Sequence, residues 1–388
     1  MESKFSERVR KLPQSKFAEI RRLVIERSDI IRLELGEPDF DTPQHIKDAA
    51  IQAINEGFTH YTSTEGILGL REAVARKLKR ENRIEADPET EILITDGGLG
   101  AVFAAIQSLV NPGDEVLFFD PAWPRYIQNV LLVHGVPKRI VLEKKNGFVP
   151  DVNEMRENIT KNTKLVILNT PNNPTGAVTP KNVLEEIGDL VVEHDLILLL
   201  DEVYERIVYE STHFSLASHS DLKDHIITVF SLSKTYAMTG WRIGCAVSNA
   251  NMIKAMSKVG GYANACRTSF AQKAAMAALD GPQECVKNMV EEYKKRRDLI
   301  VKRLNEMVLF SVNKPLGAFY VYPRIFTDVR SSDFVKQLID KAKVAVMPGT
   351  AFSMRGEKYT RISFASSMEN ISEAMDRIQR LTKQLMKH

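Results

Sequence analysis

Lys234 and its surroundings carry the clearest chemical signal in this sequence. It follows the apolar segment 226–230 and the hydroxyl residues Ser231 and Ser233, and Arg242 lies eight positions further on. A lysine is ordinarily a solvated surface charge, but an amine held among small and apolar residues loses its proton near neutral pH and attacks carbonyl carbons. Hydroxyl groups and a fixed guanidinium bind phosphate. The pattern therefore predicts a lysine that forms a Schiff base with a phosphorylated aldehyde, and pyridoxal 5'-phosphate (PLP) is the candidate.

A carboxylate and a phenol follow a second apolar segment, 196–200. Asp201 ends that segment, and a carboxylate at the end of a buried strand is costly unless a cation pairs with it. The protonated ring nitrogen of PLP would be such a cation, and PLP withdraws electrons well only while that proton is kept. Tyr204, three residues on, could donate a hydrogen bond to the phenolic oxygen of PLP. A helix cap or a local ion pair is the alternative for Asp201.

Two loops that follow other apolar segments contain possible ligands for the same group. Asn173, in Asn-Asn-Pro-Thr-Gly, carries an amide that could stabilise the phenolate of PLP without protonating it. In the turn of Gly97, Gly98 and Leu99, glycines allow backbone N–H groups and a helix N-terminus to approach a phosphate. Each segment taken alone also reads as an ordinary turn, so it indicates cofactor binding only in combination with Lys234.

An aromatic residue and an arginine complete the set of candidates. Trp123 follows the apolar segment 115–120 and is either a core residue or a flat surface on which a planar ring stacks. Arg361 lies within the apolar segment 360–364, where an arginine needs an anionic partner. A substrate carboxylate bound in bidentate fashion would be that partner, and an internal salt bridge is the alternative.

The elements that must position these residues alternate between short apolar runs and helical patterns. Several runs are apolar at nearly every position, which is typical of strands buried on both faces of a parallel sheet. The alternation predicts a doubly wound α/β domain, which binds ligands at the carboxyl ends of its strands. The expected strands are 91–95, 115–120, 164–170, 196–203 and 226–231, and the expected helices between them are 100–110, 123–134 and 181–193.

The pattern changes at Gly281-Pro282, after which a long amphipathic helix and a mixed strand and helix tail follow. We therefore predict a large PLP-binding domain with a mostly parallel, doubly wound sheet over residues 46–282. A smaller α+β domain is expected over residues 283–388. Residues 1–45 would form an N-terminal arm and part of the small domain, because 30–35 reads as a short strand.

Composition narrows the classes of function. The 388 residues suffice for two domains, and a net charge of +3 gives no reason to expect nucleic acid or an anionic membrane as a partner. Three irregularly spaced cysteines favour neither a disulfide framework nor a zinc site, so we expect no bound metal and a cytoplasmic location. The polar N-terminus lacks a signal-peptide core, and no apolar stretch approaches the roughly 18 residues that span a membrane.

Taken together, the motifs resemble the class I aminotransferases of PLP fold type I, the aspartate and aromatic aminotransferase group. Ser-Leu-Ser-Lys followed by Gly-Trp-Arg-Ile-Gly is highly specific for this group. Asn-Asn-Pro-Thr-Gly, Asp-Glu-Val-Tyr and Pro-Gly-Thr-Ala-Phe occur in the family's order and support it. The resemblance runs from about residue 33 to near the C-terminus and implies the fold and the roles that follow.

The resemblance implies that Lys234 is the Schiff-base lysine and proton shuttle, and that Asp201 pairs with the pyridinium nitrogen. Asn173 and Tyr204 would bind the phenolic oxygen, and Trp123 would stack on the ring. The phosphate would be held by hydroxyl, guanidinium and backbone groups, namely Ser231, Ser233, Arg242 and the backbone of Gly97, Gly98 and Leu99.

Substrate and partner roles also follow from the resemblance. Arg361, with Gly36 and Asn173, would position the substrate α-carboxylate, which Trp123 would also contact. Tyr61 matches a residue that reaches the phosphate of the neighbouring subunit, which implies a homodimer with shared active sites.

The implied reaction is a ping-pong transfer of the α-amino group of an amino acid to a 2-oxo acid. Glutamate and 2-oxoglutarate are expected as one substrate pair, and aspartate or an aromatic amino acid as the other donor. A PLP-dependent β-C–S lyase or another fold type I enzyme is the alternative, because those enzymes share the same residues. A PLP-binding transcription regulator would need an N-terminal DNA-binding domain, and Gly36 stands too early to leave room for one.

Two positions depart from the family pattern in ways that bear on the substrate. Leu99 stands where some aspartate-specific relatives have a lysine that recognises the distal carboxylate. Arg267 stands where relatives often have proline. Our hypothesis is that Leu99 disfavours that mode of aspartate recognition and that Arg267 or Arg125 binds a distal carboxylate instead. The alternative is that both arginines are surface or interface residues.

Overall fold

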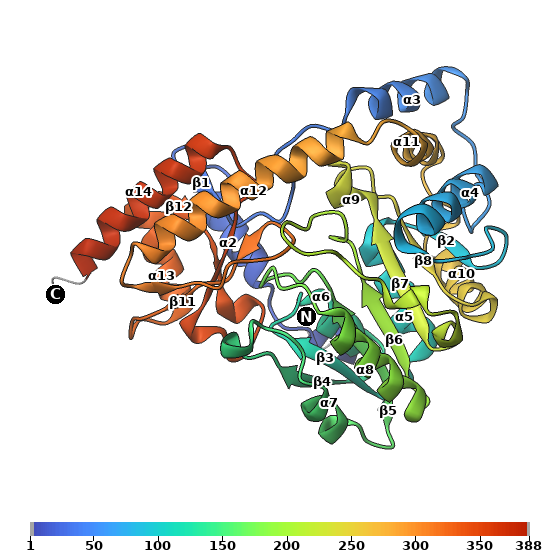
Figure 1. Ribbon diagram of the computed structural model, residues 1–388, viewed down its shortest axis with the longest axis horizontal. Helices are drawn as coiled ribbons and strands as arrows, with labels where there is room; N and C mark the ends of the chain where they lie inside the picture. The colour runs from blue at the N-terminus through green and yellow to red at the C-terminus, as the bar shows by residue number, and fades with distance from the viewer. Residues whose placement is uncertain (1–3, 386–388) are drawn as a thin grey trace.

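The computed structural model describes residues 4–385, and a seven-stranded sheet forms the centre of its larger part (Figure 1). The strands lie in the order β2-β8-β7-β6-β5-β3-β4. β8 runs antiparallel to both of its neighbours, whereas the strands from β7 to β4 are parallel to one another. This mostly parallel sheet confirms the predicted α/β fold class. The strands are β2 (Ile92–Thr95), β3 (Glu115–Asp120), β4 (Val136–Val141), β5 (Thr163–Asn169), β6 (Ile197–Asp201), β7 (Ile226–Ser231) and β8 (Gly244–Val247).

The sheet is buried on both faces, as its apolar strands predict. Neighbouring residues of one strand enter different cores, because side chains alternate between the two faces. Val116 of β3 packs in the cluster that contains α5 (Gly97–Leu109), whereas Leu117 packs in the cluster that contains α8 (Lys181–Glu193). The helices therefore cover both faces of the sheet, and a ligand site can form at the ends of its strands.

The apolar pattern does not predict β4 and β8. β4 lies at the edge of the sheet, where Lys138 and Arg139 interrupt the apolar run. β8 consists of four residues, Gly-Cys-Ala-Val, too few to show a pattern of their own. Its place between β2 and β7 depends on tertiary pairing, which local β propensity does not encode.

The remaining helices of this part surround the sheet. Figure 1 shows α3, α4 and α11 together at the end of the molecule remote from the C-terminus. The helices are α3 (Gln44–Asn55), α4 (Leu68–Lys77), α6 (Arg125–Leu132), α7 (Val152–Asn158), α9 (Leu232–Thr235), α10 (Ala250–Asn264) and α11 (Ser269–Asp280). Among the residues described, no helix is both long enough and apolar enough to cross a membrane.

A smaller group of elements comes mainly from the C-terminal part of the chain (Figure 1). Its three-stranded sheet has the order β10-β14-β13. The long helix α12 runs from beside α11 to α14, so it connects the two parts of the molecule. The elements are α12 (Glu284–Asn305), β9 (Phe310–Ser311), β10 (Tyr320–Val321), β11 (Arg324–Ile325), α13 (Ser331–Gln337), β12 (Val344–Ala345), β13 (Met347–Pro348), β14 (Thr360–Ser363) and α14 (Met368–Leu385).

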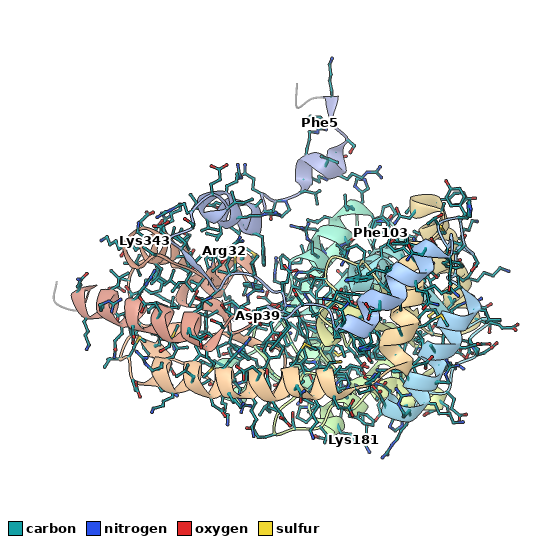
Figure 2. All side chains as sticks on the ribbon, turned by 90° about the horizontal axis from the view of Figure 1, so that it is seen from above. Phe5, Arg32, Asp39, Phe103, Lys181 and Lys343 are labelled. Carbon is teal, nitrogen blue, oxygen red and sulfur yellow. The ribbon has the colours of Figure 1, made fainter. Side chains whose placement is uncertain are left out.

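Part of the N-terminal segment packs with this C-terminal group. That part consists of α2 (Lys16–Val24) and β1 (Ile31–Arg32), and β1 pairs in parallel with β12. The short helix α1 (Glu7–Lys11) contacts α6 instead and buries none of its residues. Figure 2 shows Arg32 and Lys343 on the same side of the molecule, Phe103 on the other side, and Asp39 between them. Asp39 forms an ion pair of 2.7 Å with Arg296 of α12, so the chain is held where it passes from one part to the other.

Candidate active site

A cavity of about 310 Å³ lies where the carboxyl ends of β5, β6 and β7 meet the C-terminal strands. Its lining contains every residue that the resemblance assigns to the site except Gly97 and Tyr61. Parallel neighbours end at the same edge of a sheet, so Asn173, Asp201 and Lys234 converge although they are far apart in the sequence. The volume is in the range of sites that bind small molecules.

Lys234 lies in α9, directly after β7, and its partly buried side chain enters the cavity. Its ammonium donates a hydrogen bond of 2.5 Å to the carbonyl of Gly36. Burial lowers the pKa of Lys234 from 10.5 to about 8, with Glu37 opposing the shift and the charges of Arg361 and Arg242 adding to it. The amine is therefore easier to deprotonate than a surface lysine.

Asp201 ends β6 and is buried. One oxygen accepts a hydrogen bond of 2.5 Å from the hydroxyl of Tyr126, and the other accepts one of 3.2 Å from the N–H of Val203. Burial raises the pKa of Asp201 from 3.8 to about 6, although these two hydrogen bonds oppose it. Both donors are neutral, so a cationic ligand group such as a pyridinium would stabilise this carboxylate.

Arg361 lies in β14 and only 1% of its surface is exposed. Its guanidinium donates to the amide oxygen of Asn173 at 3.1 Å and to the carbonyl of Glu34 at 2.5 Å. Within residues 4–385, Nε of Arg361 has no hydrogen-bond partner and no carboxylate lies within ion-pair distance of the guanidinium. The internal salt bridge is therefore not present among these residues, and a carboxylate ligand fits the orphaned donor.

A further set of residues in and beside the cavity has the chemical groups that suit a phosphate. Gly97 begins α5 with a φ of +70°, and a Cβ added there would lie 2.6 Å from a nitrogen of Arg242. Arg242 donates to the carbonyl of Asp96 at 2.9 Å, which holds its guanidinium against the start of the helix. Ser231 and Ser233 line the same cavity. A helix N-terminus, a guanidinium and two hydroxyls together fit a phosphate group.

Three aromatic residues of the cavity are not predicted by the sequence patterns. Tyr126 donates to Asp201, Phe17 of α2 lies 5.6 Å from the Arg361 guanidinium, and Tyr320 hydrogen-bonds Tyr204 at 2.8 Å. Buried aromatic residues in helices and strands usually belong to the core, so their sequence context gives no functional signal. The position of Tyr126 three residues after Trp123 is the one local hint.

The structure does not support Arg267 or Arg125 as ligands of a distal carboxylate. Arg267 is buried and donates to the carbonyl of Ile94 at 3.1 Å and to the carboxylate of Asp96 at 2.9 Å. Arg125 is exposed and donates to Gln128. Neither arginine lines the cavity. Arg267 is thus not a surface residue but part of an ion pair with Asp96, and binding of a distal carboxylate by either arginine stays a prediction.

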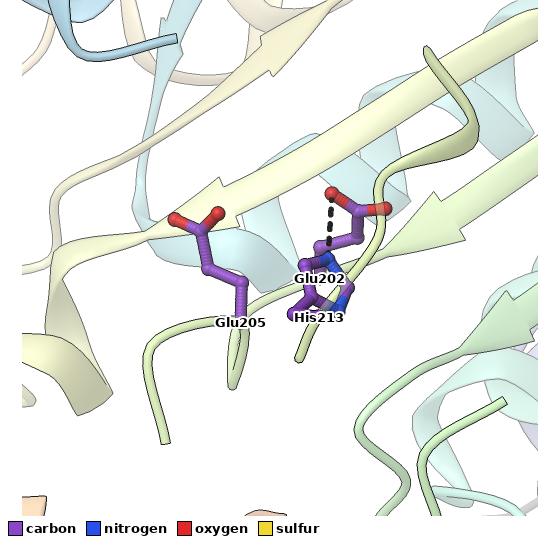
Figure 3. Close-up of side chains that lie close together, drawn as sticks. All are labelled: Glu202, Glu205 and His213. Atoms are coloured by element: carbon purple, nitrogen blue, oxygen red, sulfur yellow. Dashed lines mark ion pairs between the residues drawn. The ribbon is translucent and has the colours of Figure 1, made fainter. Parts of the chain in front are cut away.

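A second cluster of ionisable groups lies near the segment that follows β6 (Figure 3). Possible ligand atoms of Glu202, Glu205 and His213 lie within 4.8 Å of one another. Such a donor set suits a divalent cation, but the ammonium of Lys77 and the amide of Asn82 already bind Glu205. Although burial opposes it, the charge of Glu202 raises the pKa of His213, whose ring nitrogen lies 3.3 Å from that carboxylate. We interpret the cluster as a network of ion pairs.

The comparisons with known proteins agree with this geometry. Residues 28–378 match the family described as aminotransferase class I and II. The chain is 45% identical to the aspartate aminotransferase of Pyrococcus abyssi over 92% of each chain, and 45% identical to the aromatic-amino-acid aminotransferase 2 of Thermococcus litoralis, also over 92% of each.

Solved structures give the same result. The aromatic aminotransferase from Pyrococcus horikoshii aligns with a TM-score of 0.90 at 44% identity, over 95% of this chain and 99% of that one. The aspartate aminotransferase from Thermus thermophilus with maleate aligns with a TM-score of 0.92 at 38% identity, over 97% and 99%. The relatives support the aminotransferase interpretation and not the lyase alternative. The family uses PLP and acts on amino acids and 2-oxo acids. The chain is an aminotransferase of PLP fold type I and belongs to the aminotransferase class I and II family.

Proposed function

We propose that this aminotransferase binds PLP covalently at Lys234 and exchanges the amino group of an amino acid with a 2-oxo acid in a ping-pong sequence. One observation carries the proposal, namely that an amine of lowered pKa (Lys234), a buried carboxylate (Asp201) and a buried guanidinium (Arg361) converge in one cavity. PLP, when bound, supplies an electron-accepting ring that stabilises negative charge at the substrate α-carbon.

Lys234 has two tasks in this proposal. Because its pKa is about 8, part of the amine is neutral near pH 7 and can attack a carbonyl carbon. The same nitrogen, when it is not attached to the coenzyme, would accept the proton of the substrate α-carbon and deliver it to the coenzyme carbon on the other side of the substrate nitrogen. The carbonyl of Gly36, 2.5 Å away, keeps the amine inside the cavity.

The surrounding residues orient the ring and its charges. Asp201, oriented by Tyr126, would keep the ring nitrogen protonated, and Trp123 would stack on the ring face. Tyr204 would donate to the phenolic oxygen. Asn173 would do the same with its amide N–H, because its amide oxygen already accepts from Arg361.

Two different arginines would bind the two anionic groups, the coenzyme phosphate and the substrate α-carboxylate. Arg242 would bind the phosphate, together with the hydroxyls of Ser231 and Ser233 and the backbone N–H groups of 97–99. Arg361 would bind the substrate α-carboxylate through its free Nε, beside Gly36. Because the carboxylate and the phosphate are held apart, the α-carbon is fixed near Lys234.

We propose glutamate and 2-oxoglutarate as one substrate pair and an aromatic amino acid as the other donor. Phe17, Leu99 and Trp123 present apolar surface to the cavity, which suits an aromatic side chain. The relative from Thermococcus litoralis is named for aromatic amino acids and the one from Pyrococcus abyssi for aspartate, so the names leave both open. Leu99 has no charge with which to bind the second carboxylate of aspartate, and for this reason we propose an aromatic donor.

We also propose a homodimer in a reducing, cytoplasmic location. The side chain of Tyr61 is 89% exposed in the single chain, which is compatible with a role at the phosphate of a second subunit. Tyr262 is exposed to a similar degree, and exposed aromatic residues are common at subunit interfaces. Cys245, Cys266 and Cys285 are free thiols, which suits a reducing compartment.

The absorption spectrum of the purified, PLP-loaded protein tests this function. We expect a visible band that glutamate removes and 2-oxoglutarate restores, and that tyrosine removes more efficiently than aspartate. Lys234→Ala should lack the band of the bound coenzyme, whereas Lys181→Ala, on the outside of α8, should keep it (Figure 2). A band that no amino donor changes would contradict amino transfer. A wild-type protein without a band after addition of PLP would contradict the role of Lys234.

A further inference from the structure

Tyr320 lies between the two halves of the site, although nothing in its sequence context singles it out. It belongs to β10 and pairs with Ser363 of β14, two residues after Arg361. Residues two apart on a strand share a face, so Tyr320 and Arg361 are diagonal neighbours across the two strands. Tyr320 is 1% exposed and lines the cavity. Its side chain therefore reaches the cavity from the C-terminal part of the chain.

The hydroxyl of Tyr320 contacts that of Tyr204, which lies in the turn three residues after β6 of the large sheet. The two oxygens are 2.8 Å apart, and either can be the donor. A phenol has one proton to donate. If Tyr204 donates its proton to the phenolic oxygen of the coenzyme, only Tyr320 can supply the proton between the two hydroxyls. Burial raises the pKa of both phenols, so both keep their protons at neutral pH.

The ring of Tyr320 contacts the group that would bind the substrate carboxylate. The Arg361 guanidinium carbon lies 4.4 Å from the centre of the ring, within the range of a cation–π interaction. The ring of Phe352 lies 4.8 Å from the same carbon, so aromatic rings restrict the guanidinium. A Cβ added at Gly36 would lie 2.4 Å from the Tyr320 hydroxyl, which shows how closely the Gly36 backbone approaches it.

We propose that Tyr320 is a positioning residue with two contacts. Its hydroxyl donates a hydrogen bond to Tyr204, and its ring restricts the guanidinium of Arg361, so that Tyr320 couples the residue that would bind the substrate carboxylate to the residue that would bind the phenolic oxygen of the coenzyme. The inference rests on the proposed function, because it uses Tyr204 as a donor to the coenzyme. A hydrogen bond from Tyr320 polarises the Tyr204 hydroxyl and strengthens the bond that Tyr204 donates in turn. Tyr320 itself needs no contact with the reacting atoms.

The test is a pH titration of the visible band of the PLP-loaded protein, a readout that does not depend on turnover. Donors to the phenolic oxygen stabilise its negative charge, so a weaker donor raises the pKa of the chromophore. Tyr320→Phe should raise the midpoint by about half to one unit, and Tyr204→Phe should raise it more. The double variant should match Tyr204→Phe alone, because Tyr320 acts through Tyr204.

Tyr322→Phe is the matched control. Tyr322 follows β10, is buried, and its hydroxyl donates to the carbonyl of Gly349 at 3.4 Å, away from the cavity. We expect it to leave the midpoint unchanged. A role of Tyr320 in packing alone would make Tyr320→Phe and Tyr322→Phe behave alike in this titration.

The KM for glutamate distinguishes the contribution of the Tyr320 ring from that of its hydroxyl. Tyr320→Phe keeps the ring over Arg361, so KM should change less than about two-fold. Tyr320→Leu removes the cation–π contact and should raise KM about five- to thirty-fold. If the leucine variant does not fold, the phenylalanine variant alone still decides the hydroxyl role.

Three results would overturn the proposal. The first is a midpoint in Tyr320→Phe equal to that of wild type, and the second is a shift that adds to that of Tyr204→Phe. The third is a KM for Tyr320→Leu equal to that of wild type. A wild-type protein that shows no visible band would refute the proposed function itself, which none of these three results does.

Discussion

Replacing Asp201 with asparagine should stabilise the PLP-free protein at neutral pH while it removes the group proposed to hold the coenzyme ring. Burial raises the pKa of Asp201 from 3.8 to about 6, although hydrogen bonds from Tyr126 and Val203 oppose the shift. The folded pKa is the higher one, so the folded state binds more protons between these two values. The contribution of this carboxyl group to the free energy of unfolding is therefore largest below pH 3.8 and is lost as the pH rises through about 6.

The expected magnitude follows from the shift. About two units correspond to about 3 kcal/mol of lost stability at pH 7 to 8. Asparagine removes this cost, but it lacks one of the two acceptor oxygens that receive the Tyr126 and Val203 donors, a loss of about 1 kcal/mol. Asp201→Asn should therefore be more stable than wild type by about 2 kcal/mol at pH 8 and less stable by about 1 kcal/mol near pH 4.

Urea unfolding of the PLP-free protein across this pH range measures the difference. Asp189→Asn, on the exposed face of α8, is the control and should not change the pH dependence. In parallel, Asp201→Asn should bind PLP more weakly, because the ring nitrogen loses its anionic partner. A variant that is less stable than wild type at pH 8, or that differs from it equally at every pH, would refute the reasoning.

Four further changes test other parts of the structure. Lys234→Ala should lose the site at which borohydride reduction attaches the coenzyme, as mass spectrometry would show, and turnover should fall at least about a hundred-fold. Arg361→Lys keeps the charge but not the bidentate geometry, so KM for the amino donor should rise about ten- to a hundred-fold in steady-state assays. Leu99→Lys should raise kcat/KM for aspartate relative to tyrosine about ten-fold. Hydrogen bonds from Arg297 lower the pKa of Glu210 to about 2, so Glu210→Gln should destabilise the protein at pH 7 and progressively less as the pH falls from 4.5 to about 2, measured by urea midpoints.

Each of these expectations has a clear contrary result. Coenzyme attached elsewhere in wild type would contradict the role of Lys234, and an unchanged KM in Arg361→Lys would contradict carboxylate binding there. Unchanged selectivity in Leu99→Lys would remove the reason for preferring aromatic donors. A loss of stability in Glu210→Gln that stays constant with pH would mean that its ion pair with Arg297 is not the cause.

The central sheet and the residues at its strand ends could be predicted because their signals are local. A strand buried on both faces is apolar along its whole length, and a charged residue at its end, such as Asp201 or Lys234, is visible against that background. β4 and β8 escaped prediction because one is a polar edge strand and the other is too short. A pattern within one segment carries no information on the pairing that defines them.

Residue types and spacing alone determined the α/β fold class, and they predicted the coenzyme chemistry and the lysine, carboxylate and guanidinium proposed to carry it. Only the tertiary structure decided that Arg267 is occupied by Asp96, that Tyr126 orients Asp201, and that Tyr320 joins Tyr204 to Arg361. The physical reason is that a buried arginine or tyrosine takes its role from the partner it meets. Such partners come from strands and helices that are distant in the sequence, and their distances are set by strand register and by packing between the two parts of the chain.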